Sequence, residues 1–374
     1  MKKKNLISIV IIAILVIIAG ILIGNNRYLS SLRSEASDFT VYDTASITRL
    51  FFADKSGNQV VLERDGTAWT VNNEFRANQG LVNEMLYTLN RMRIKMPVSL
   101  KKSDNIVTRM SSTNTKVEVY QMVPRINLFN KVKLFYHEKR SKVFYIGDVT
   151  QDNNGTYILK EGGDKVYIVY MHGFRGFISS RFTAKPIDWR DHTIFNAKLA
   201  DIESLKLEIN NDPDNGFIIR ENGRLQYTMN RLNGEPVDFS DNKVLNLLSS
   251  FGDVRFEAFL NEIEPERRDS IINSPFLQRL TLTTKDGKSS TVTTYRMNSN
   301  ADMYNYSKED LEKYDDMIKD PDHKYALLSE GNEFVLIQNF VFGKLLKPAD
   351  FYSKDYKDEI PQIYYKELET VESR

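Results

Sequence analysis

The feature that most constrains this chain is an uncharged, apolar run close to its N-terminus. Residues 6–24 carry one polar side chain, Ser8, and Lys2, Lys3 and Lys4 stand just before them, separated by Asn5. At 1.5 Å per residue, a helix of this length spans roughly 28 Å, which is close to the hydrocarbon thickness of a bilayer. The run therefore predicts a transmembrane helix within residues 1–24, and no later segment is comparably apolar.

A cleaved signal peptide is the alternative interpretation of this run. The apolar part of such a peptide is usually about 7–15 residues long and is followed by small residues of the A-x-A type. This run is longer, and residues 21–26 contain no such site, so we expect an uncleaved signal anchor. Positive charge beside a membrane span stays in the cytoplasm. The lysines therefore predict a single-pass protein of a bacterial inner membrane, with the bulk of the chain in the periplasm.

Charge balance and the lack of cysteine limit the chemistry of the body that follows. Lysine and arginine total 51, aspartate and glutamate total 50, and the net charge is +1. Nucleic-acid binding is typical of a strongly basic face, so we expect no nucleic-acid partner. Because the chain has no Cys, disulfides, thiolate metal sites, a lipoprotein anchor and cysteine nucleophiles are excluded.

The second informative feature is an order of predicted elements that occurs twice. In the first copy, strands are expected at 47–52, 59–64 and 67–71, with a hairpin turn at Asp65-Gly66. A helix follows, and its apolar stripe consists of Leu81, Met85, Leu89 and Met92.

The same order returns from residue 202 onward. Strands are expected at 202–207, 217–220 and 227–229, with a turn at Asn222-Gly223. Ser240 is a favourable N-cap for a helix whose apolar face consists of Val244, Leu247, Leu248 and Phe251.

A late pair of strands extends the correspondence, because Tyr157 and 166–169 match Tyr325 and 334–337. The extra residues of the second copy lie between Met297 and Asp322 and include a predicted helix at 307–318. Turn chemistry shared by chance between two unrelated β-rich domains is the alternative explanation.

These patterns predict an α+β fold, in which an N-terminal transmembrane helix is followed by two tandem, similar β-rich units. Each unit is expected to contain antiparallel hairpins and one main helix. The expected organisation is an anchor at 1–24, a stalk at 25–45, a first unit at 46–190, a second unit at 191–353 and a charged tail at 354–374.

Several of these segments together resemble one known family. They are the apolar run, the hairpin followed by Trp69, the Gly-Phe-Arg-Gly stretch at 173–176 and the Asp-Trp-Arg-Asp stretch at 188–191. From about residue 1 to residue 351, the chain is similar to the domain-of-unknown-function 4340 family in its Bacteroidetes-type, membrane-anchored form. The resemblance implies an accessory role in the envelope, beside gliding-motility-type ABC transporter components. It implies no catalytic residues.

Asp188, Asp191 and His192 form the densest polar cluster in the sequence, next to Trp189 and Arg190. A carboxylate that orients a histidine base is one arrangement these residues allow. No nucleophile or oxyanion motif accompanies them, so we favour a connector in which Trp189 packs and Asp191 forms an ion pair with Arg190 or a helix cap. None of the four histidines stands three or four positions from another, and we expect no metal and no cofactor.

Two functions remain open at this stage. The favoured one is a non-enzymatic, membrane-anchored envelope protein that serves as an accessory or scaffold to a transport complex. Its partners are then the membrane, through the N-terminal helix, and another envelope protein. The alternative is an envelope hydrolase that uses Asp188, Asp191 or His192.

The anchor interpretation predicts the result of a fusion experiment. A C-terminal reporter that is active only outside the cytoplasm should be active, and the mature protein should retain residues 6–24 because the run lacks a cleavage site. N-terminal sequencing of the membrane-extracted protein measures the second point. A mature chain that begins near Asn25 would contradict the anchor while leaving export intact.

Overall fold

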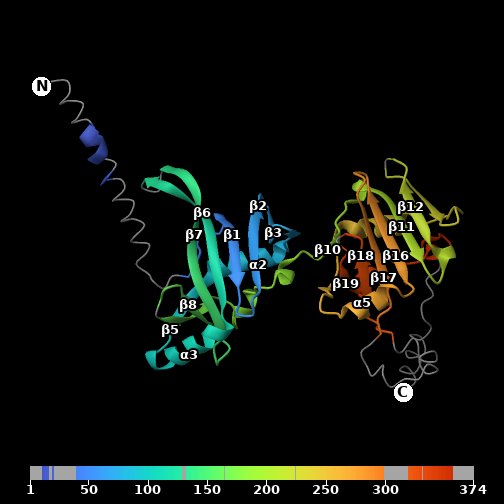
Figure 1. Ribbon diagram of the computed structural model, residues 1–374. Coiled ribbons are helices and arrows are strands. Elements are labelled where there is room, and N and C mark those ends of the chain that lie inside the picture. Colours follow the sequence, from blue (N-terminus) through green and yellow to red (C-terminus); the bar gives the residue numbers. More distant parts are fainter. Residues whose placement is uncertain are drawn as a thin grey trace, which may run out of the picture. The chain divides into compact units, whose positions relative to one another are not determined.

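The computed structural model describes residues 11–16, 19–20, 39–128, 132–163, 165–223, 225–298, 319–330 and 332–356. The chain divides into two compact units, Met1–Asp191 and His192–Arg374. Each unit is built on one large antiparallel sheet with helices (Figure 1), which confirms the predicted α+β class.

The first unit contains a nine-stranded sheet in the order β4-β3-β2-β1-β6-β7-β8-β9-β5. Its strands are β1 (Ile47–Ala53), β2 (Gln59–Asp65), β3 (Ala68–Val71), β4 (Phe75–Arg76), β5 (Met92–Pro97), β6 (Thr115–Leu128), β7 (Val132–Val149), β8 (Thr156–Lys160) and β9 (Val166–Met171). Its helices are α2 (Gln79–Arg91), α3 (Leu100–Thr113), η1 (Ser179–Arg181) and η2 (Pro186–Trp189).

The second unit contains an eight-stranded sheet in the order β13-β12-β11-β16-β17-β18-β19-β15, and a small sheet formed by β10 and β14. Its strands are β10 (Thr193–Phe195), β11 (Ile202–Ile209), β12 (Phe217–Glu221), β13 (Tyr227–Arg231), β14 (Val254–Arg255), β15 (Ala258–Phe259), β16 (Gln278–Thr284), β17 (Ser289–Tyr295), β18 (His323–Leu328) and β19 (Phe334–Gln338). Its helices are η3 (Leu199–Asp201), η4 (Pro213–Asn215), α4 (Asp241–Ser249), η5 (Ser250–Gly252), α5 (Pro265–Ile272), α8 (Asn339–Phe342) and α9 (Ala349–Tyr352).

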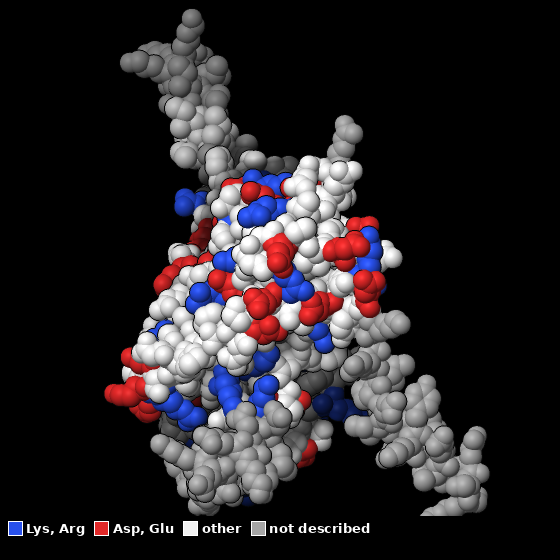
Figure 2. Space-filling model, turned by 90° about the vertical axis from the view of Figure 1, so that its right-hand side faces the viewer, with Lys and Arg blue, Asp and Glu red and all other residues white. Residues whose placement is uncertain are grey.

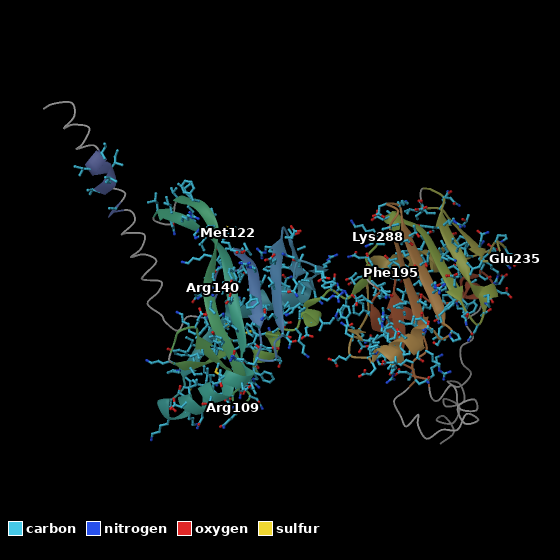
Figure 3. The ribbon with its side chains drawn as sticks, in the orientation of Figure 1. Arg109, Met122, Arg140, Phe195, Glu235 and Lys288 are labelled. Carbon is cyan, nitrogen blue, oxygen red and sulfur yellow. The ribbon has the colours of Figure 1, made fainter. Side chains whose placement is uncertain are left out.

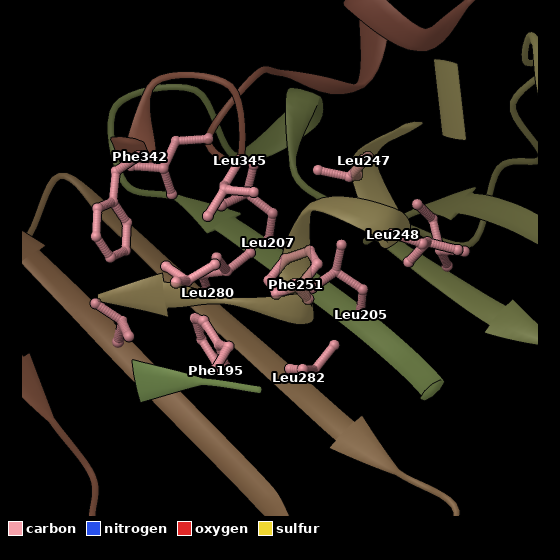
Figure 4. Packing of buried hydrophobic residues seen from close by; sticks show 14 of the residues in the cluster. Phe195, Leu205, Leu207, Leu247, Leu248, Phe251, Leu280, Leu282, Phe342 and Leu345 are labelled. Carbon is pink, nitrogen blue, oxygen red and sulfur yellow. The ribbon is translucent and has the colours of Figure 1, made fainter. Parts of the chain in front are cut away.

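One face of each sheet forms the main core, and the other face carries a smaller cluster, because alternate side chains of a strand point to opposite faces. In β1 the inward residues Leu50 and Phe52 are fully buried, and α2 packs Val82, Met85 and Leu89 into the same cluster. In the second unit, Leu205 of β11 and Leu280 of β16 pack with α4 in the same way (Figure 4).

The β1–β6 ladder of the first sheet and the β11–β16 ladder of the second have the same irregularity in their pairing register. The β1–β6 ladder shifts between Ile47 and Arg49, and the β11–β16 ladder shifts between Ile202 and Ser204. Such a bulge inserts one unpaired residue and increases the local twist. Both sheets therefore begin their first long strand with the same kink.

The ladders also place particular side chains at equivalent positions. Trp69 of β3 lies opposite Arg64, and Tyr227 of β13 lies opposite Glu221, at the same distance along each hairpin from the shared bulge. Tyr157 pairs with Ile168, and Tyr325 pairs with Leu336, in the corresponding late hairpins.

The end of each unit returns to the start of its main helix. Asn78, the N-cap of α2, donates its backbone N–H to the carbonyl of Trp189 at 2.7 Å. Ser240, the N-cap of α4, donates to the carbonyl of Tyr352 at 2.8 Å. Trp189 therefore corresponds to Tyr352. The sequences Pro-Ile-Asp-Trp at 186–189 and Pro-Ala-Asp-Phe at 348–351 are similar, but the two hydrogen bonds shift the structural correspondence by one residue.

The prediction of one main helix in each unit is wrong. The first unit contains α3 in addition to α2, and the second contains α5 in addition to α4. α3 packs Ile106 and Met110 against Val166 of β9. The sequence of α3 is rich in Lys, Ser and Thr, so its short apolar stripe does not predict a buried helix by itself. The stripe can be recognised only once the sheet residues against which it packs are known.

Two local predictions are also corrected. Leu81 is 40% exposed, because α2 begins at Gln79 and its buried stripe starts at Val82. The Asn222-Gly223 turn is part of a longer loop, since the ladder closes between Glu221 and Tyr227 and the Asn222 N–H bonds to the Gln226 carbonyl at 2.8 Å.

The predicted stalk and tail are partly ordered against the units. Phe39 and Val41 belong to the first core, so the last part of the predicted stalk is not a spacer. At the start of the predicted tail, Lys354 forms an ion pair with Asp238 at 2.6 Å. Residues 25–38, 357–374 and the predicted helix at 307–318 lie outside the described residues.

Most of the predicted anchor also lies outside the described residues, although 11–16 are helical. Within the parts of the chain that the structure describes, no helix is both long enough and apolar enough to span a bilayer.

Trp189 should be a principal stabilising residue of the first unit. It is buried and stacks on Phe52, with ring centroids 5.4 Å apart, and its indole N–H donates to the Thr183 carbonyl at 3.0 Å. Trp189→Ala should lower the free energy of unfolding by about 3–5 kcal/mol, as is usual for a buried aromatic residue. Denaturant unfolding measures this. Tyr42→Ala, at a position that is 70% exposed, is the control and should cost less than about 1 kcal/mol. Equal losses would contradict the assignment.

Candidate functional site

The structure places the two predicted site aspartates in the last part of the first unit, residues 179–191, which we call the closing segment. Asp188 lies in η2 and accepts a hydrogen bond from the hydroxyl of Thr183. Asp191 donates its backbone N–H to the Arg76 carbonyl at 2.9 Å, and its carboxylate lies 3.4 Å from the Arg76 guanidinium. The Asp191 side chain is 13% exposed. Both carboxylates are thus engaged in contacts that hold this segment in place.

The structure gives Asp191 an ion-pair partner that the sequence did not predict, Arg76. Arg190 places its guanidinium 3.7 Å from the centroid of the Phe75 ring, while Arg76 forms the ion pair with Asp191. The sequence could not indicate Arg76, because this contact depends on the bridge between Ala77 and Arg190 that joins distant parts of the chain.

His192 belongs to the second unit. Its ring stacks on Phe256, with centroids 4.5 Å apart, and meets the edge of Phe259 at 5.3 Å. Its carbonyl accepts a hydrogen bond from the Phe256 N–H at 3.0 Å. The hydrolase function that would use Asp188, Asp191 or His192 stays a prediction.

A pocket of about 270 Å³ lies between α2 and the closing segment of the first unit. Leu81 and Met85 of α2 and the ring of Trp189 supply its apolar surface. Asp188 also lines it, and is the one predicted site residue to do so. The mixture of an apolar surface with a few polar groups is typical of binding pockets.

An ion pair fixes the polar side of this pocket. Arg181 lies 3.0 Å from the Glu84 carboxylate, donates to the Thr88 hydroxyl at 2.8 Å, and places its guanidinium 4.9 Å from the Phe174 ring. These contacts hold Arg181 in one orientation. Arg181 was not among the predicted site residues, and Leu81 was predicted to lie on the apolar stripe of its helix. Neither residue stands in a motif that would have indicated a pocket.

The outer face of the first sheet carries a second polar cluster. The Glu118 carboxylate lies 2.7 Å from Lys116 and 3.3 Å from Arg140, and accepts a hydrogen bond from the Tyr120 hydroxyl at 2.5 Å. Burial acts to raise the pKa of Glu118, but the bonds from Lys116 and Tyr120 outweigh it and hold the pKa below its usual range. This cluster links β6 to β7, and we interpret it as a stabilising network of the sheet.

His323 in the second unit lies between two carboxylates. Its Nε2 is 3.1 Å from Glu257 and its Nδ1 is 3.2 Å from Asp320. Within the described ranges, no group of three or more His, Asp or Glu residues is arranged to hold a metal ion. On the face seen in Figure 2, acidic and basic side chains are interspersed.

Comparison with protein families decides the relationship that the sequence suggested. The model described as "Domain of unknown function (DUF4340)" matches residues 69–270, from β3 of the first unit to α5 of the second. The chain belongs to the DUF4340 family. No curated protein and no solved structure matches it. The match covers the closing segment and Asp188, Asp191 and His192, and it carries no assigned activity.

Lys324 of β18 is a lysine whose burial disfavours the charged form of its side chain. It pairs across the ladder with the buried Ile337, and directly opposite residues share one face of a sheet, so its stem lies on the core face. Burial, with a further contribution from the charge of Lys319, lowers the pKa of Lys324 to about 8.

Lys324→Met should therefore stabilise the protein at neutral pH. The unfolded lysine keeps its usual pKa of about 10.4 and binds more protons than the folded one between pH 8 and 10. The charge penalty is complete below pH 8 and disappears as pH rises through that interval. The variant should gain about 2–3 kcal/mol at pH 7 and lose most of that advantage by pH 10.5, measured by denaturant unfolding across pH.

Lys288→Met is the matched control, since Lys288 has a side chain that is 61% exposed (labelled in Figure 3). Its stability should differ little from that of the parent protein at any pH. A Lys324→Met advantage that does not depend on pH would show that packing, and not charge, is responsible.

Proposed function

We propose that this member of the DUF4340 family is a non-enzymatic, membrane-anchored envelope protein whose body binds another envelope protein. The observation that carries the proposal is the uncharged run at 6–24 behind three lysines, which is suited to holding the body beside a bacterial inner membrane. The body is then in the periplasm. Tethering raises the local concentration of the body near other membrane proteins, so a modest interface is sufficient.

The pocket of the first unit is the surface that we assign to the partner. Leu81, Met85 and Trp189 offer an apolar surface, and the Glu84–Arg181 ion pair at its edge offers directional polar contacts. An apolar side chain that enters such a pocket, surrounded by polar contacts, is the usual anatomy of a protein-binding hot spot. The engagement of Asp188 and Asp191 in local contacts favours binding over hydrolysis.

We further infer that the two units arose by duplication of one α+β unit. The shared strand order, the bulge at the start of β1 and β11, and the return of each unit to its helix N-cap support this inference. A scaffold with two related units can use one for structure and the other for binding. A transport component, of the gliding-motility-type ABC class, is the partner that the Bacteroidetes-type resemblance suggests.

A single cysteine at Leu81 tests the partner surface, because the chain has no other Cys. Leu81→Cys, carrying a photo-crosslinker in intact cells, should yield a discrete adduct with a membrane protein. Glu235→Cys, at an exposed site of the second unit, is the control and should not yield that adduct. The replacement Leu81→Arg should reduce recovery of the same partner about tenfold or more, as expected when a hot-spot contact is lost.

Two results would contradict the proposed function. One is the same adduct pattern from both positions. The other is hydrolysis of a substrate by the purified protein that is lost in Asp191→Asn while the melting temperature is unchanged.

A further inference from the structure

The first unit carries a β-ribbon that has no counterpart among the described residues of the second unit. β6 and β7 have 14 and 18 residues, whereas the corresponding β16 and β17 have seven each. β1 stops pairing with β6 at Gln121, and β6 and β7 continue beyond it as two strands (Figure 1). We call residues 121–128 and 132–140 the arm. Met122 lies further along it than Arg140, which marks its base (Figure 3).

The arm is amphipathic. Directly opposite residues of an antiparallel pair share a face, and alternate residues of one strand do so too. The cross-strand pairs Pro124–Tyr136, Ile126–Leu134 and Leu128–Val132 therefore form one apolar face. Asn127 pairs with Lys133 on the opposite face, where alternation also places Arg125.

The apolar face is not covered by the described part of the chain. Val132, Leu134 and Tyr136 are each about half exposed, and none of the arm's apolar residues belongs to a hydrophobic cluster of the described residues. Phe135, which alternation places on the opposite face with Lys133, is also 68% exposed, and its φ of +57° is a conformation that costs an aromatic residue on the order of 1–3 kcal/mol. The corresponding β16–β17 hairpin exposes no large apolar side chain. The sheet architecture that the two units share therefore does not require an extended apolar arm.

The base of the arm is where the chain enters the first sheet from its N-terminal side. Met122 donates its N–H to the Ser46 carbonyl at 2.8 Å, and the Gln121 amide donates to Ser46 Oγ at 2.9 Å. The arm extends about 24 Å past Gln121, from seven steps of about 3.4 Å to Leu128. The 14 residues between the predicted anchor and Phe39, which begin the predicted stalk at 25–45, would span at most about 50 Å if fully extended. A bilayer that holds residues 6–24 is thus within reach of the arm.

We propose that the arm lies on the surface of that bilayer, with its apolar face in the acyl-chain boundary and its cations toward anionic lipid headgroups. Exposed apolar side chains backed by Arg125 and Lys133 are the combination that binds an anionic membrane surface. Tyr136 is suited to the interface, where amphipathic rings are enriched. The inference rests on the proposed tether, since the tether supplies the neighbouring bilayer.

Depth-dependent quenching in reconstituted vesicles tests the arm. The full chain, with Leu134→Cys carrying an environment-sensitive fluorophore, is placed in phosphatidylcholine vesicles with or without phosphatidylglycerol and with nitroxide-labelled acyl chains. We expect severalfold stronger quenching in the anionic vesicles than for Asp286→Cys, at the turn of the corresponding hairpin in the second unit. Arg125→Gln and Lys133→Gln should each weaken arm binding about fivefold, from roughly 1 kcal/mol per cation.

The outcomes separate the arm from the tether. If the chain floats with the vesicles but the Leu134 probe is quenched no more than the Asp286 probe, the arm inference is wrong and the tether stands. If the chain does not float, the tether fails and the arm inference fails with it. A third outcome is that the Leu134 probe is shielded only in native membranes and a crosslinker at that position captures a protein. A protein then occupies the arm, and the lipid assignment is overturned. Circular dichroism of each variant confirms that it has folded.

Discussion

The first unit depends on the return of its closing segment to the start of α2. Trp189 stacks on Phe52 of the central strand β1, and its carbonyl accepts the N–H of the helix N-cap Asn78. One residue therefore fixes the sheet, the helix and the end of the unit relative to one another. The pocket between α2 and this segment, and the contacts of Asp188 and Asp191, are consequences of that closure.

The second unit uses the same closure with different chemistry. Tyr352 takes the place of Trp189, but its buried hydroxyl has no hydrogen-bond partner within the described residues, and burial raises its pKa. Trp189 donates its indole N–H to the chain. The hydrogen-bonded backbone frame is thus retained while the side chain that fills it changes, as expected where volume and position matter more than identity.

A main difference between the units lies outside the shared sheet, in the hairpin that extends past the end of its neighbouring strand. β6 and β7 extend past the end of β1, whereas β16 and β17 stop at a tight turn with Gly287 at φ +85°. The extension exposes apolar side chains, which a two-stranded ribbon cannot bury by itself. A scaffold that is stable without the arm can carry it as a binding element, in the way that loops on a rigid frame carry function.

Short-range patterns in the sequence were sufficient for the fold class, most early strands and the helices α2 and α4. Period-2 alternation and the N-cap Ser240 act over a few residues, so they can be identified without a partner. The family relationship was also visible from the sequence. The helix α3 and the burial of Phe39 were not, because each becomes favourable only against a surface that distant strands assemble.

The sequence by itself determined the charge balance, the apolar N-terminal run and the alternation that makes two β-rich units. Only the tertiary structure decided what the candidate residues do. Asp191 is paired with Arg76, His192 stacks in the other unit, and Leu81 faces a pocket and not the core. The physical reason is that each of these outcomes is set by contacts between residues far apart in the chain, and such contacts leave no periodic signal in the sequence.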